Sequence, residues 1–229
     1  MYVHLSHRRA VVGVRSLQLT HAPTAEDVAL LDGCGVLVLD GRHGAFALAM
    51  AREARARGVP VLLDAETRDR PCAAPLLACA DIVVTSVSAP LLQSYLPAAT
   101  EIACDTTTDT EALFVAAQHV LDENPAARCV VVTHGEHGAH VLSRTADGRV
   151  EEMHCAAEHV PALQLVDTTG AGDAFVAALA CATARGCGLA GALRLAAHVS
   201  ARKCTQLGAH AGTPHLAELP PDLQHLLFP

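Results

Sequence analysis

The strongest constraint on the fold is a regular alternation of short apolar segments with longer segments of helical spacing. The apolar segments are rich in Val, Ile and Leu, and they cover residues 10–19, 35–40, 59–64, 80–86, 101–104 and 128–133. Strands of a parallel sheet are buried on both faces, and joining two of them requires a crossover, usually a helix. The sequence therefore predicts an α/β fold with a doubly wound, mostly parallel sheet flanked by helices.

Capping and breaking residues place the helices between these strands. A short helix is expected from Thr24, and longer helices over 44–57, 108–123, 173–185 and 189–206. Glycines at 58, 186 and 208 supply the left-handed residue that commonly ends a helix. After the last of the parallel strands, an Asp147-Gly148 pair indicates the turn of an antiparallel hairpin.

The composition excludes several classes of protein. With 229 residues, the chain is predicted to form a single domain over 1–229. The net charge of −8 without a basic cluster argues against nucleic acid and anionic membranes as partners. No apolar segment approaches the roughly 18 residues of a spanning helix, and no signal peptide is recognised. Nine scattered cysteines without a CxxC pair indicate thiols in a reducing compartment, so a cytoplasmic location is expected.

The segment "VDTTGAGDAF", residues 166–175, is the most informative for function. A helix is expected to begin near Asp173, so the backbone N–H groups of Gly170, Ala171 and Gly172 would face outward at its positive end. The absence of side chains at 170 and 172 would let an anion approach the backbone closely. Asp173 would then stand beside a phosphate cradle, where a carboxylate can orient a hydroxyl group and accept its proton.

Other interpretations compete with this one. Glycine-rich turns with an Asp cap also occur for purely structural reasons. A dinucleotide-binding fingerprint fits less well, because "GAGDAF" lacks the third glycine of G-x-G-x-x-G and lies far from the first βαβ unit. A P-loop is excluded, because the only lysine is Lys203 and no Gly-Lys-Ser/Thr is present.

The segment "DTTGAGDAF" resembles the second signature of the ribokinase (PfkB) family of sugar and nucleoside kinases. "VVVTHGEHGAHVL" is similar to the family's TxGxxG nucleotide loop, and "GALRLAAHVSARKCTQLGAHAGTP" to its closing nucleotide segment. The stretches "LDGRHGAFALAMAREARARG", "VPVLLDAETRDRP" and "ADIVVTS" are closest to the ketohexokinase-like branch. The resemblance covers the chain from about residue 10 and implies a ribokinase-like fold.

The resemblance also implies roles for individual residues. Asp173 would be the catalytic base, and Gly170, Ala171 and Gly172 the anion hole. ATP would contact Thr133, Gly135, Gly138, Ser86 and Gly208, with Mg²⁺ as its companion ion. Asp167 and Thr169 match positions that hold a monovalent cation such as K⁺ in some members. Arg42 and His43 border the region of the sugar pocket in the ketohexokinase-like branch.

Two departures from the family pattern leave alternatives open. "SVSA" at 86–89 stands where many members carry Asn-x-x-Glu, which weakens the magnesium assignment. The Gly-Gly-x-Asn sugar motif, the N-terminal strands and the β lid of the family are not found. The prediction is therefore an ATP-dependent sugar kinase, with a catalytically inactive nucleotide-binding remnant or regulatory subunit as the alternative. The sheet would lack its first members, and such an exposed edge invites pairing into a homodimer.

Two further groups of polar residues are expected to be solvated rather than functional. His134, His137 and His140 recur at every third position of a glycine-containing turn, which favours a solvated loop over a metal site. Asp64, Glu66 and Arg68 follow the end of a predicted strand, where ligands of α/β proteins tend to bind. A salt-bridged loop is the preferred interpretation of these three residues.

Overall fold

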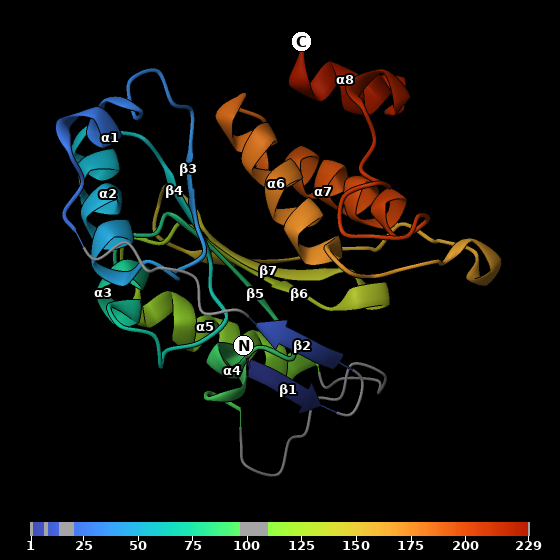
Figure 1. Cartoon of the computed structure of the whole chain (residues 1–229), viewed down its shortest axis with the longest axis horizontal. Helices are drawn as coiled ribbons and strands as arrows, with labels where there is room; N and C mark the ends of the chain where they lie inside the picture. The colour runs from blue at the N-terminus through green and yellow to red at the C-terminus, as the bar shows by residue number, and fades with distance from the viewer. Residues whose placement is uncertain (1, 7–8, 14–20, 97–109, 229) are drawn as a thin grey trace.

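The computed structural model describes residues 2–6, 9–13, 21–96 and 110–228. The strand predicted at 101–104 lies outside these residues, as does the part of the first predicted strand beyond Gly13. Figure 1 shows a twisted central sheet with helices packed on both of its faces. The predicted α/β fold is therefore confirmed.

Six strands form the central sheet in the order in which they occur along the chain. They are β3 (Leu37–Leu39), β4 (Val61–Asp64), β5 (Ile82–Ser86), β6 (Cys129–Thr133), β7 (Ala139–Arg144) and β8 (Val150–Cys155). β3 to β6 pair in parallel, whereas β7 and β8 pair antiparallel and form the predicted hairpin around Asp147-Gly148. Within the described residues β3 is an edge strand, with β4 as its single neighbour.

A second, two-stranded sheet is formed by β1 (Tyr2–Ser6) and β2 (Arg9–Gly13). The two strands pair antiparallel, with Tyr2 opposite Gly13. This hairpin is separate from the central sheet (Figure 1). The first predicted strand, 10–19, therefore coincides with β2 over its described part, but it does not belong to the parallel sheet.

The helices divide into two layers (Figure 1). One layer holds α2 (Gly44–Ala56), α3 (Ala73–Leu77), α4 (Pro90–Gln93) and α5 (Thr110–Glu123), and the other holds α6 (Ala171–Ala184), α7 (Leu189–Lys203) and α8 (Pro221–Leu227). The short α1 (Ala25–Ala29) begins with a capping box, in which Thr24 and Asp27 satisfy each other's backbone N–H groups.

Each layer packs against its own set of strand residues and forms a separate apolar cluster. Leu63 belongs to the cluster under α2 and α5, and Leu62 to the cluster under α6 and α7. Leu62 is 0% exposed and Leu63 is 3% exposed. Side chains alternate between the faces of a strand, so a sheet covered on both sides needs apolar residues at consecutive positions. This requirement explains the unbroken run "VLLD" in β4.

Some helix boundaries differ from the sequence-based predictions. α6 begins at Ala171 rather than near Asp173, and α7 ends at Lys203 rather than near Gly208. α3 and α4 were not predicted, because five and four residues are too short for a helical period to be visible. Among the described helices, none is both long and apolar enough to cross a membrane.

The two-sided burial of β4 predicts the effect of two core substitutions. Leu62→Ala and Leu63→Ala should each lower the free energy of unfolding by about 2–5 kcal/mol. Because the two side chains belong to different clusters, the double variant should show the sum of the single losses within about 0.5 kcal/mol. Urea denaturation of the three variants measures this, and a strongly non-additive double variant would contradict the two-layer packing.

Candidate active site

The chain enters α6 through a left-handed turn at Gly170. Gly170 is the N-cap and has a φ of 81°, a region that residues with a Cβ atom rarely adopt. A Cβ atom at this position would also lie 2.5 Å from the carbonyl oxygen of Ala209. Both the turn and the contact with the segment after α7 therefore require glycine. These two constraints explain the glycine at position 170 without any role in ligand binding.

Gly172 lies in the first turn of the same helix and has no such reason. Its φ is negative, and a Cβ atom there would meet nothing within 4 Å. Glycine costs about 1 kcal/mol relative to alanine inside a helix. The open space above Gly172 is the room that an anion would need to approach the start of α6.

The N–H groups at this helix start are not all available to a ligand. The N–H of Ala171 donates to the carbonyl of Thr168 at 3.1 Å. Within the described residues, the N–H groups of Gly170 and Gly172 donate to no other group. The N–H groups of Gly170 and Gly172 are therefore available to a ligand, whereas the N–H group of Ala171 is used within the turn.

Asp173 is exposed and lines a cavity of about 580 Å³. The cavity lies beside the edge strand β3, between α2 and α6. Its wall is mainly apolar, and its polar members are Asp40, His43, Asp64 and Asp173. Asp173 shares its helical face with Val176, Ala177 and Ala180, which lie three, four and seven residues later and line the same cavity. The carboxylate therefore faces a space in which a small molecule can be held.

The two residues predicted on the substrate side are placed differently. His43 is the N-cap residue of α2 and lines the cavity together with Asp173. Arg42 is exposed and pairs with Asp40, with 2.7 Å between Nε and Oδ2, and it does not line the cavity. The structure brings His43, but not Arg42, to the wall that carries the predicted base.

Asp167 anchors the turn that precedes α6. Its Oδ1 accepts the N–H of Thr169 at 2.9 Å, and its Oδ2 accepts the N–H of Gly208 at 2.8 Å. These bonds to Thr169 and Gly208, with the nearby charge of Lys203, lower the pKa of Asp167 to about 2. The Asp167 carbonyl accepts a bond of 2.6 Å from the ammonium of Lys203, which is 0% exposed.

This arrangement does not fit the monovalent cation that the family resemblance suggested for Asp167 and Thr169. The carboxylate oxygens already accept hydrogen bonds from backbone N–H groups. The Asp167 carbonyl already accepts a hydrogen bond from the ammonium group of Lys203. A second cation at this carbonyl would be repelled by the buried ammonium group. Lys203 thus places its own ammonium group at the Asp167 carbonyl.

Four of the five predicted nucleotide residues lie at the ends of neighbouring strands and in the turn after β6, whereas Gly208 lies in the segment after α7. Ser86 and Thr133 are the last residues of β5 and β6 and are directly paired. Gly135 and Gly138 have φ values of 53° and 88° in the tight turn between β6 and β7. A Cβ atom on Gly138 would lie 2.1 Å from the carbonyl oxygen of Cys155, so the close approach of the chain after β8 requires glycine there.

A cluster of four histidines supports this turn. The ring centroids of His134 and His137 are 4.6 Å apart, those of His134 and His140 5.9 Å, and those of His140 and His154 4.9 Å. His134 and His140 are buried, so the prediction of a solvated loop is wrong for these two residues. Burial, together with the neighbouring histidines, lowers the pKa of His134 to about 4. No metal-binding group of His, Cys, Asp and Glu is found in the described part of the chain.

Two residues near the candidate site, Lys203 and Asp64, are not identified as site residues by the sequence patterns. Lys203 lies on the buried face of α7 with Ala192, Ala196 and Val199, a helical spacing that could have marked it as a buried charge. The sequence favours a salt-bridged loop for Asp64, but the residue lines the same cavity as Asp173. Its position at the end of a fully apolar strand was the available signal.

Comparison with known proteins identifies the family. The family model of pfkB carbohydrate kinases matches residues 14–216. The chain therefore belongs to the pfkB family of carbohydrate kinases. This match includes every residue of the candidate site, from Arg42 to Gly208.

Solved structures share the fold at low sequence identity. Ribokinase of Arabidopsis thaliana, complexed with ribose and ATP, superimposes with a TM-score of 0.70 and 24% identity, covering 90% of this chain and 60% of its own. A nucleoside kinase of Burkholderia thailandensis in complex with inosine gives 0.52 and 22%, covering 80% and 54%. A candidate ribokinase II from E. coli, complexed with ATP and Mg²⁺, gives 0.61 and 21%, covering 88% and 61%. This chain thus spans about 60% of the length of the first of these kinases.

The different environments of the two glycines predict opposite effects on stability. Gly170→Ala should lower the free energy of unfolding by about 1–3 kcal/mol, because it forces a side chain into a left-handed conformation. Gly172→Ala should leave it unchanged or raise it by up to about 1 kcal/mol. Thermal and urea unfolding of both variants tests this. A destabilised Gly172→Ala variant would show that the space above the helix is not open.

The buried histidines predict a loss of stability in acid. The unfolded chain binds a proton at His134 near pH 6.5, whereas the folded protein resists it until about pH 4. The free energy of unfolding contributed by this residue should therefore fall as the pH drops from about 6.5 to about 4. The gap between wild type and His134→Gln, measured by urea denaturation, should narrow over this window.

Proposed function

We propose that this protein catalyses the ATP-dependent phosphorylation of a hydroxyl group on a small carbohydrate. Asp173 acts as the general base, and the open N–H groups at Gly170 and Gly172 stabilise the phosphoryl group during transfer. The observation that carries the proposal is the start of α6, where an exposed carboxylate, an unfilled space above Gly172 and a cavity occur together. Membership of the pfkB family supports the same reaction.

The chemistry requires few groups beyond these. The transition state of phosphoryl transfer is loose, so positioning and charge stabilisation contribute most of the rate. Backbone N–H groups at a helix start are fixed in place and need no reorganisation when negative charge develops. The carboxylate of Asp173 orients the attacking hydroxyl and accepts its proton late in the reaction. Its exposed position on the cavity wall lets it meet the acceptor directly.

ATP is assigned to the strand ends beside this cavity. Ser86 and Thr133 would present hydroxyl groups to the phosphates, and the turn with Gly135 and Gly138 would follow the nucleotide. Gly208 contributes indirectly, because its N–H is held by Asp167 in the turn that shapes the helix start. The E. coli kinase complexed with ATP and Mg²⁺ supports the same cofactors for this chain.

Mg²⁺ would accompany the phosphates of ATP rather than occupy a cage of carboxylates. Mg²⁺ usually keeps several waters and takes one or two protein ligands together with substrate phosphates. The hydroxyl of Ser86, which lies 3.1 Å from that of Ser88, offers neutral oxygens at the place of the family's Asn-x-x-Glu. K⁺ is not part of the proposal, because Lys203 already supplies positive charge at Asp167.

The finer assignments belong to the same proposal. The ketohexokinase-like branch, a single domain over residues 1–229 and a cytoplasmic location are consistent with an ATP-using enzyme of this fold. A homodimer would form through the exposed edge strand β3.

A second candidate function is nucleotide binding without turnover. This function would need only the nucleotide side of the site, namely Ser86, Thr133 and the turn with Gly135 and Gly138. ATP would then stabilise the protein against thermal unfolding, but no acceptor would be phosphorylated.

The proposed base can be tested by a single isosteric change. Asp173→Asn keeps the shape of the side chain but removes the proton acceptor, so kcat should fall by about 10²–10⁴-fold. ADP release with a panel of ketoses, pentoses and nucleosides provides the measurement. Asp222→Asn is the matched control, because Asp222 is also an exposed aspartate in the first turn of a helix. Equal turnover in wild type and Asp173→Asn would remove the assignment.

A further inference from the structure

Asp64 is a carboxylate at the wall of the candidate active-site cavity that forms no ion pair with the residues the structure describes. It is the last residue of β4, follows three buried residues and is itself only partly exposed. The described residues provide no hydrogen bond or ion pair to its side chain. It lines the same cavity as Asp173, which lies in the first turn of α6.

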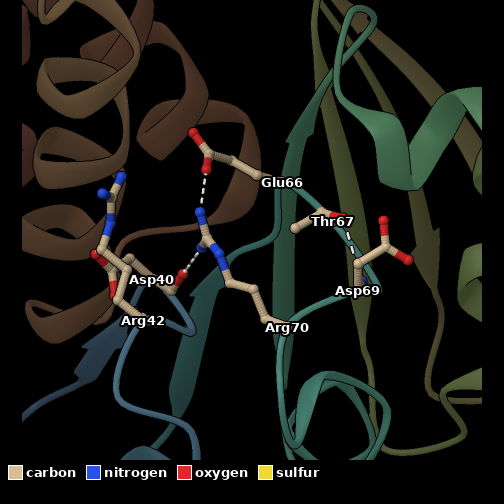
Figure 2. A network of polar contacts seen from close by, with 6 residues as sticks. All are labelled: Asp40, Arg42, Glu66, Thr67, Asp69 and Arg70. Carbon is tan, nitrogen blue, oxygen red and sulfur yellow. Dashed lines mark hydrogen bonds and ion pairs between the residues drawn. The ribbon is translucent and has the colours of Figure 1, made fainter. Parts of the chain in front are cut away.

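The arginines of the loops after β3 and β4 pair with groups other than Asp64. Figure 2 shows Arg70 donating to the carbonyl of Asp40 and to the carboxylate of Glu66. Arg42 pairs with Asp40, and Arg68 pairs with Glu123 across to α5. This network joins the loop after β3 to the loop after β4 and fixes the rim of the cavity. Within the described residues, none of these arginines forms an ion pair with Asp64, although the charge of Arg42 acts on it from a distance.

The electrostatic surroundings of Asp64 oppose its ionisation. Burial raises the pKa of this carboxyl to about 6, and the charges of Glu66, Asp173 and Asp40 act in the same direction, with Arg42 opposing them. A partly buried carboxylate without a donor costs free energy unless a ligand supplies the missing hydrogen bonds. The fold therefore maintains an acceptor group that is suited to a partner from outside the chain.

The rest of the cavity limits what that partner can be. Val38, Leu39, Phe46 and Val176 form apolar wall, and three carboxylates provide the negative charge. The C–H faces of a sugar or polyol fit apolar wall, and its hydroxyl groups donate to carboxylates. A carboxylate or phosphate on the acceptor would meet like charge in a partly desolvated space.

We propose that Asp64 is a second acceptor-binding residue, which holds hydroxyl groups other than the one steered by Asp173 and excludes anionic acceptors. This inference rests on the proposed kinase function and adds to it a substrate class, a neutral polyhydroxylated molecule. Asp64 contributes to binding and selection, whereas Asp173 contributes to the transfer step.

The assignment also predicts how acceptor binding depends on pH. The groups that face Asp64 are Asp40, Arg42 and His43 from the β3–α2 segment, Glu66 from its own loop and Asp173 from α6. Below a pH of about 6, Asp64 becomes protonated and accepts hydrogen bonds less well. The KM for the acceptor should therefore rise as the pH falls through this value in wild type, and this rise should be absent in Asp64→Asn.

Kinetics of Asp64→Asn provide the main test. The KM for a neutral acceptor should rise about tenfold or more, as expected for lost hydrogen bonds to a charged group, while kcat and the KM for ATP change little. Wild type should prefer ribose over ribonate by about 100-fold or more in kcat/KM, and the variant should show a clearly smaller preference, with Asp40 and Asp173 still present. Asp69→Asn is the control: it makes the same charge change on the same loop, but Asp69 is exposed and lies outside the cavity wall (Figure 2).

The outcomes separate this inference from the kinase proposal. If turnover depends on Asp173 but Asp64→Asn leaves the acceptor KM and the ribose preference unchanged, or matches Asp69→Asn, the inference is overturned and the kinase remains. If wild type shows no turnover, the pH titration of the Asp64 carboxyl can be followed by ¹³C NMR with and without each sugar. A titration that shifts to lower pH with ribose, but not with ribonate, supports the site without the kinase. No response to either sugar overturns the assignment.

Discussion

The close contact between Gly170 and the backbone of Ala209 is the constraint on which the rest of the site depends. This contact admits no side chain at residue 170, and it fixes the left-handed turn that starts α6. Asp167 reinforces the turn by accepting N–H groups from Thr169 and Gly208, while buried Lys203 holds its carbonyl. The start of α6 is therefore rigid before any ligand arrives, as electrostatic stabilisation of a transition state requires.

The two helical layers position the start of α6 relative to the sheet. Parallel strands bring their carboxyl ends to one edge of the sheet, which is where ligands of α/β proteins bind. α6 packs on one face through small residues such as Ala178 and Ala182, so it lies close to the strands below it. The cavity at the edge strand β3 then carries Asp64 from the sheet and Asp173 from the helix. In our proposal, one side of the site binds an anion and the other binds a neutral acceptor.

The sequence predicted most of the fold because its local patterns agree with its global arrangement. Unbroken apolar runs such as "VLLD" identified the parallel strands, and Gly58 and Gly186 marked helix ends correctly. The start of α6 was placed two residues late, because the left-handed turn at Gly170 is set by a contact with a segment nearly forty residues away. The roles of Lys203 and Asp64 depend on neighbours from other elements, which periodicity cannot supply.

The central claim, that phosphate binds at the start of α6, can be tested by following backbone amides with ¹⁵N–¹H NMR during titration with MgATP. The account predicts that the resonances of Gly170 and Gly172 shift strongly and downfield, as for N–H groups that begin to donate to an anion. The Gly188 resonance, at the start of α7, should move little. Shifts that spare Gly170 and Gly172, while other regions respond to the nucleotide, would contradict the account.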